Sequence, residues 1–129
     1  MYKKISAFRP FFLGVFYYGH TQESKIYTYS QKDYQKGLEL YHSEQYQAAQ
    51  VVFEKVKSKA TDMETKANSA YYEANSAIRL NQLGADKLME DFVANYPTST
   101  KRNSAYRDVA DYYFETGKYP YALKWYNKV

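Results

Sequence analysis

The chain contains no cysteine, which excludes a disulfide framework, a thiolate metal site and a cysteine nucleophile. It also excludes a lipid-modified cysteine, so any association with a cell envelope would lack a lipid anchor. The two histidines, His20 and His42, do not form a pair with metal-ligand spacing. The five glycines never group into a loop that cradles phosphate. We therefore expect no cofactor, no metal and no enzymatic activity.

Outside its first ten residues, the chain also lacks a large excess of charge of one sign. The net charge is +4, from 18 basic and 14 acidic residues. Three basic residues lie among the first ten, so the rest of the chain is close to neutral. A protein that binds a phosphate backbone keeps a basic stripe in its folded part. The one dense basic run, Lys55, Lys57 and Lys59, suits a solvated helix end, and no nucleic-acid partner is expected.

Residues 1–22 follow the order of a secretory signal peptide. A basic start precedes an apolar run from Pro10 to Tyr18, and small and polar residues follow it. Such signals have an apolar middle of about 7 to 15 residues, whereas a membrane-spanning helix takes about 20. Because Arg9 crowds this run and no clean cleavage site precedes Gln22, a disordered aromatic arm is the alternative. The first interpretation predicts a periplasmic or cell-envelope protein, and the second a cytoplasmic one.

From residue 30 onward, apolar and small residues recur at spacings of three and four, which indicates helices rather than strands. The 17 tyrosines suit half-buried helix faces, because the ring packs while the hydroxyl stays wet. Turn signals that contain Gly, Asn, Ser or Pro separate the apolar segments. The sequence predicts helices near residues 30–43, 46–59, 62–80, 83–95, 99–116 and 119–128.

These helices form three similar copies, over residues 30–59, 62–96 and 99–129. Each copy has an alanine in its second helix, and the spacings between these alanines are 36 and 37 residues: Ala49, Ala85 and Ala122. Each first helix has a small residue that allows close approach: Gly37, Ala74 and Ala110. Large residues three to four positions after the alanine, such as Phe53 or Tyr126, are expected to fill the space toward the next copy. A two-helix unit of this period is typical of tetratricopeptide repeats, whose length is about 34 residues.

The stretch from Phe92 to Ser99 has the form F-x-x-x-Y-P-x-S. At these residues the chain resembles the tetratricopeptide repeat family, particularly periplasmic members such as the outer-membrane-assembly lipoprotein and the TolA-binding protein. The resemblance covers residues 30–129, although a lipoprotein would need the cysteine that this chain lacks. It implies an all-α, right-handed superhelix of antiparallel helix pairs, with about three repeats. The concave face, made by the first helix of each pair, would bind a peptide or a partner domain.

The family register places ten residues on that concave face. They are Tyr34, Leu38, Tyr41 and His42 in the first copy, Tyr71, Asn75 and Ile78 in the second, and Arg107, Asp111 and Phe114 in the third. The second copy has an irregular length between its helices, so its register can slip by one residue. Each set has an alternative role. The tyrosines would pack between neighbouring helices, and Arg107 and Asp111 would pair with each other along one helix. The surface favours aromatic and aliphatic contacts with a peptide over capture of a carboxylate.

The last expected helix ends on the apolar Val129, at the place where another helix pair would dock. Repeat arrays need a polar terminal helix for solubility, so the last repeat is expected to be uncapped. This predicts either a fragment of a longer array or self-association through the last helix. We therefore expect a non-enzymatic interaction scaffold. A structural oligomerisation subunit and a cytosolic adaptor are the alternatives.

Overall fold

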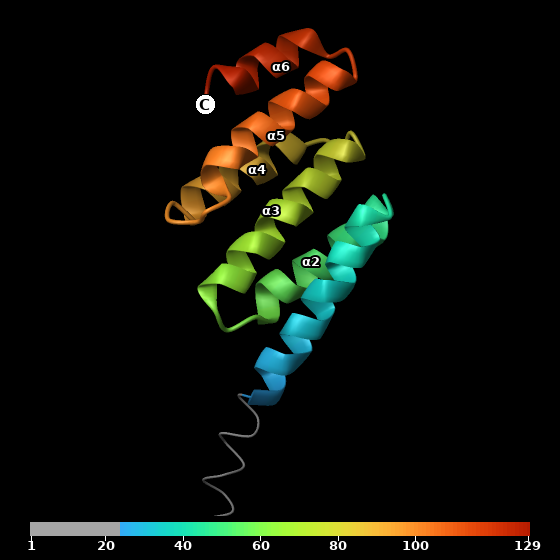
Figure 1. The fold of residues 1–129 in the computed structure, drawn as a ribbon, viewed down its shortest axis with the longest axis vertical. Coiled ribbons are helices and arrows are strands. Elements are labelled where there is room, and N and C mark those ends of the chain that lie inside the picture. Colours follow the sequence, from blue (N-terminus) through green and yellow to red (C-terminus); the bar gives the residue numbers. More distant parts are fainter. Residues whose placement is uncertain (1–23) are drawn as a thin grey trace, which may run out of the picture.

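The computed structural model describes residues 24–129, and this part of the chain consists of helices and turns without a strand (Figure 1). The all-α class is confirmed for these residues, and the interpretations of residues 1–22 lie outside them. An N-terminal helix covers residues 24–42. The helices that follow are α2 (Tyr46–Lys59), α3 (Met63–Arg79), α4 (Ala85–Asn95), α5 (Arg102–Glu115) and α6 (Tyr119–Tyr126).

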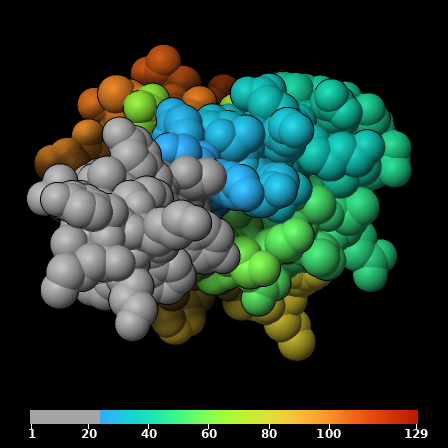
Figure 2. Space-filling view, turned by 90° about the horizontal axis from the view of Figure 1, so that it is seen from below, coloured from blue at the N-terminus to red at the C-terminus, as the bar shows by residue number. Residues whose placement is uncertain are grey.

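The helices stack in chain order along the longest axis of the molecule, and each runs opposite to the one before it (Figure 1). The N-terminal helix, α3 and α5 lie roughly parallel, one above the other. Seen from below, the N-terminal helix packs over the residues that follow it in α2 and α3 (Figure 2). No described helix has the length and apolar character needed to cross a membrane.

The same backbone turn ends the first helix of each pair. One residue in each turn has a left-handed conformation: Glu44 (φ 62°), Asn81 (φ 54°) and Gly117 (φ 80°). The amide after each of these residues donates to a carbonyl five positions earlier, at 2.9 Å for Gln45 to Leu40, 3.1 Å for Gln82 to Ala77 and 2.8 Å for Lys118 to Tyr113. This is the Schellman arrangement, which satisfies the last carbonyls of a helix. Its recurrence at spacings of 37 and 36 residues gives three copies of one helix–turn–helix unit.

The small residues predicted at the helix crossings are buried. The three alanines of the second helices and the two of the first helices have between 0% and 5% of their surface exposed: Ala49, Ala85, Ala122, Ala74 and Ala110. At Gly37, an added Cβ would lie 2.7 Å from Cε1 of Phe53, a ring that is itself fully buried. Glycine is therefore required there because the N-terminal helix and α2 approach closely.

One large residue at the second-helix positions differs from the prediction. Phe53 fills the core as expected, but Tyr126 is 38% exposed and Trp125 is fully buried in its place. Trp125 lies three residues after Ala122, whereas Phe53 lies four after Ala49. In the short helix α6, the position three residues after the alanine faces α5, so Trp125 packs beside Tyr106 with ring centroids 5.8 Å apart.

Three helix starts also differ from the sequence-based boundaries. The N-terminal helix is already formed at residue 24, because no Gly or Pro lies between residues 24 and 30 to interrupt it. Helix α4 begins at Ala85 rather than near residue 83, because Gly84 has a left-handed conformation (φ 80°). Helix α5 begins at Arg102, because the Ser99 hydroxyl accepts from the Lys101 amide at 3.1 Å and so caps a preceding turn.

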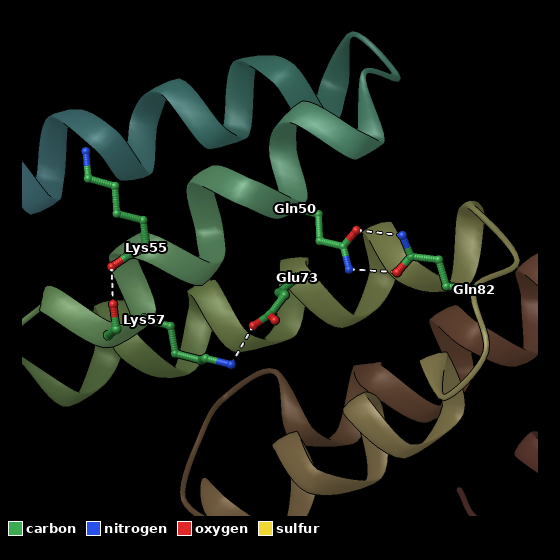
Figure 3. A network of polar contacts seen from close by, with 6 residues as sticks. Gln50, Lys55, Lys57, Glu73 and Gln82 are labelled. Atoms are coloured by element: carbon green, nitrogen blue, oxygen red, sulfur yellow. Dashed lines mark hydrogen bonds and ion pairs between the residues drawn. The ribbon is translucent and has the colours of Figure 1, made fainter.

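Polar contacts join the first pair of helices to the second (Figure 3). The Lys57 ammonium lies 2.6 Å from the Glu73 carboxylate, and the Glu73 side chain is only 8% exposed. The amides of Gln50 and Gln82 exchange two hydrogen bonds of 2.8 and 2.9 Å. Lys57 lies in the last turn of α2 as predicted, but it pairs with a buried acid instead of being simply solvated.

Candidate functional site

The first helices of all three units contribute to one groove of about 330 Å³, which we call the tyrosine groove. Two residues come from the N-terminal helix, four from α3 and four from α5. They are Tyr41 and His42; Tyr71, Tyr72, Asn75 and Arg79; and Asp108, Asp111, Tyr112 and Glu115. The three helices reach a common groove because each ends at the same turn and lies beside its equivalent in the next unit (Figure 1).

Five of the ten residues predicted for the concave face lie together in this groove: Tyr41, His42, Tyr71, Asn75 and Asp111. Of the other five, Tyr34 and Leu38 are half-buried on the N-terminal helix and do not line it. The Tyr34 ring packs against those of Phe53 and Tyr72, with centroids 5.9 and 6.5 Å away. Burial in this aromatic cluster raises the pKa of Tyr34 to about 12.

Ile78 is wrongly placed by the sequence register. Only 1% of its surface is exposed, and it belongs to the hydrophobic core. Arg79, one position later, lines the groove instead. Tyr71, Asn75 and Arg79 are spaced by four residues along α3, whereas Ile78 is only three residues after Asn75. Arg107 and Phe114 are exposed and lie outside the groove lining.

Sequence reasoning missed half of the groove residues: Tyr72, Arg79, Asp108, Tyr112 and Glu115. A signal for them is present in the sequence. Tyr72 and Arg79 are seven residues apart, as are Asp108 and Glu115. A spacing of seven returns to the same face of a helix after two turns. Polar and aromatic residues at this spacing therefore identify the face of α3 and of α5 that does not pack in the hydrophobic core.

Arg79 contacts aromatic rings from three helices. Its guanidinium carbon lies 5.7, 5.5 and 4.9 Å from the ring centroids of Tyr41, Tyr46 and Tyr112. Its Nε donates a hydrogen bond of 3.1 Å to the Tyr41 hydroxyl. A guanidinium over tyrosine faces is attracted by the ring quadrupole, by about 0.5 to 2 kcal/mol per contact. Arg79 therefore joins the N-terminal helix, α2 and α5 across one end of the groove.

The floor of the groove holds a hydrogen bond between α3 and α5. The Tyr71 hydroxyl donates to the Asp108 carboxylate, 37 residues further along the chain. Burial raises the pKa of Tyr71 well above its usual value, and the Asp108 carboxylate raises it further. Burial also raises the pKa of Tyr41. Both phenols therefore stay protonated at neutral pH. The Tyr71 hydroxyl donates to Asp108, and the Tyr41 hydroxyl accepts from Arg79.

The lining of the groove is acidic. It contains Asp108, Asp111 and Glu115, and Arg79 is its one basic residue. Within residues 24–129, none of these carboxylates forms an ion pair with a lysine or arginine. The expected pairing of Asp111 with Arg107 is replaced by a hydrogen bond from the Tyr126 hydroxyl of α6, and this bond raises the pKa of Tyr126.

A second cavity, of about 420 Å³, lies between the start of α3 and the loop that joins α4 to α5. It is lined by Met63, Ala67, Tyr96 and Pro97 among others, and it contains the end of the F-x-x-x-Y-P-x-S phrase. This cavity belongs to a single junction between units, whereas the tyrosine groove is built by all three. Across the described residues, no group of three or more His, Asp or Glu has a geometry that could hold a metal ion.

In comparisons with known proteins, no family model, curated protein or solved structure matches the chain.

Proposed function

We propose that this protein is a non-enzymatic scaffold of the tetratricopeptide type, and that its tyrosine groove binds an extended peptide segment of a partner protein. In this proposal the three helix pairs form a right-handed superhelix whose concave face is the groove. The observation that carries it is that the N-terminal helix, α3 and α5 all line one groove. Helix-pair arrays use surfaces of this kind to bind partners.

The side chains of the groove suit peptide recognition. Tyrosine provides a large and rigid contact area at a low cost in conformational entropy. Tyr41, Tyr72 and Tyr112 are half-buried, so each ring is held by its neighbours while part of it stays accessible. The carboxylates of α5 add hydrogen-bonding groups. This mixture of rigid aromatic anchors and polar groups is typical of protein-binding surfaces.

We propose the periplasm or cell envelope as the location. This part of the proposal depends on the order of charges and apolar residues in 1–22. Sequencing the N-terminus of the protein isolated from cells tests it, because removal of this segment is the signature of export. An intact N-terminus supports the cytosolic adaptor instead.

A structural subunit that oligomerises through α6 is the second candidate, and the exposed apolar residues of this helix favour it. Tyr119 and Leu123 are about three-fifths exposed, at 60% and 62%, and Val129 beyond the helix is 63% exposed. A contiguous apolar surface of this kind is typical of an interface. Light scattering over a concentration series separates the candidates, because only the second requires stable oligomers.

Peptide binding is tested with a displayed random-peptide library selected on the folded full chain. A photoreactive benzophenone side chain replaces His42, which lines the groove and is exposed. The matched control carries it at Glu54, an exposed residue on α2 that does not line the groove. Selected peptides should crosslink at position 42 and not at position 54. Equal crosslinking at both positions, or peptides that crosslink only at the control position, would refute the assignment of the groove.

A further inference from the structure

We propose that the tyrosine groove selects a peptide segment carrying a lysine or arginine side chain. The cation would lie between the carboxylates of Asp111 and Glu115 and the tyrosine rings beside them. This inference rests on the proposed function of the groove and names the chemistry of its occupant. Three kinds of observation carry it: the charge of the groove, the behaviour of its rings toward cations, and its size.

The first observation is charge complementarity. Three carboxylates face one guanidinium in the groove lining, which gives the lining a formal charge of −2 with a neutral histidine, and the charge is −1 when the Lys101 ammonium beside Tyr71 and Tyr72 is included. Asp108, Asp111 and Glu115 are spaced by three and four residues, which places them along one face of α5. Within residues 24–129, Asp111 accepts a hydrogen bond from the Tyr126 hydroxyl and Asp108 one from the Tyr71 hydroxyl. A carboxylate offers about four lone-pair positions. Acceptor capacity for a cationic donor therefore remains on α5.

The second observation is independent of the acidic residues. Tyrosine rings in and beside the groove already receive cations of this chain. Arg79 lies over Tyr112 at 4.9 Å, and the Lys101 ammonium lies 5.3 Å from the ring centroids of both Tyr71 and Tyr72. The rings of the groove are therefore suited to contact with positive charge. An anionic side chain would be repelled by the α5 carboxylates.

The third observation is size. At about 330 Å³, the groove lies near the lower end of the range for ligand pockets, which is about 300 to 1,000 Å³. It therefore fits one long side chain and its adjoining backbone better than a folded domain. A lysine or arginine places its methylene groups along the tyrosine rings and its charge at the carboxylates.

Three capped peptides test this inference: Gly-Leu-Gly-Xaa-Gly-Leu-Gly with lysine, norleucine or glutamate at the central position. Each is titrated into the isotope-labelled full chain, and nitrogen–proton correlation spectra report affinity and location. The lysine peptide should bind about tenfold more tightly than the norleucine peptide, since one exposed ion pair and one cation–π contact together approach the free energy of a tenfold change. The glutamate peptide should bind more weakly than both.

The double variant Asp111→Asn, Glu115→Gln should abolish the preference for lysine over norleucine while keeping the groove's shape. Asp91→Asn is the matched control, because Asp91 is an acid on α4 outside the groove with a side chain that is 50% exposed, and it should leave the preference unchanged. Thermal unfolding of each variant verifies that it is folded. Loss of the preference in the control as well would show a non-specific effect of net charge and overturn the inference.

The outcomes separate this inference from the proposed function. If all three peptides shift groove resonances with equal affinity, or the glutamate peptide binds most tightly, the cation preference is wrong and peptide binding in the groove stands. If the peptides, and those selected from the library, shift only resonances outside the groove, the proposed function fails as well.

Discussion

The ion pair between Lys57 and Glu73 gives the sharpest stability prediction. The Lys57 side chain is 34% exposed and the Glu73 side chain 8%, with 2.6 Å between the charged atoms. Removing one partner of a fully buried pair costs about 3 to 5 kcal/mol, because the other charge stays buried without compensation. An exposed pair contributes about 0.2 to 1 kcal/mol. Lys57→Met lies between these limits, and we expect a loss of about 2 kcal/mol in the free energy of unfolding.

Urea denaturation followed by circular dichroism measures this loss in a double-mutant cycle. Lys57→Met combined with Glu73→Gln should recover most of it, because no buried charge is then left unpaired. The matched control is Lys55→Met. Lys55 pairs with Asp33 at 3.4 Å, but their side chains are 55% and 41% exposed, so this change should cost at most about 0.5 kcal/mol. If Lys57→Met costs no more than Lys55→Met, or the double variant is no more stable than the single one, the reasoning is refuted.

Three further changes have expected outcomes of their own. Gly37→Ala should lower the free energy of unfolding by about 1 to 3 kcal/mol in urea denaturation, because the new Cβ would meet the buried Phe53 ring at 2.7 Å; an unchanged stability would show that the ring can move away. Gly117→Ala should cost about 1 kcal/mol in the same assay because of its φ of 80°, and no loss would argue against the left-handed turn. The raised pKa of Tyr71 means that the folded state favours the neutral phenol over the charged one. The neutral Tyr71 therefore stabilises the fold below the unfolded-state pKa of about 10, and this stabilisation is lost as the pH rises above that value. Tyrosinate absorbance and circular dichroism recorded together should show Tyr71→Phe unfolding at a different alkaline pH from the wild type, and identical profiles would contradict the assignment.

Local signals in the sequence were sufficient to predict the helices and their turns. Gly117 and Asn81 belong to residue types that tolerate the left-handed conformation, and the structure places them in the two later turns. Glu44 adopts the same conformation without such a preference, and its turn was predicted from the polar residues around it, which include Ser43.

The groove was only partly predictable, because its lining depends on helix rotation. Tyr71 and Asn75 line the groove as predicted, but Ile78, three residues after Asn75, lies in the core, and Arg79, four residues after Asn75, lines the groove instead. The pairing of Lys57 with Glu73 was not predictable, since it depends on the crossing of α2 and α3 rather than on spacing within one helix.

The position of Arg79 has a consequence for the shape of the molecule. Because its guanidinium touches rings on the N-terminal helix, α2 and α5, any tilt of α5 away from the N-terminal helix must lengthen at least one of those contacts. The curvature of the stack is thus coupled to a single side chain.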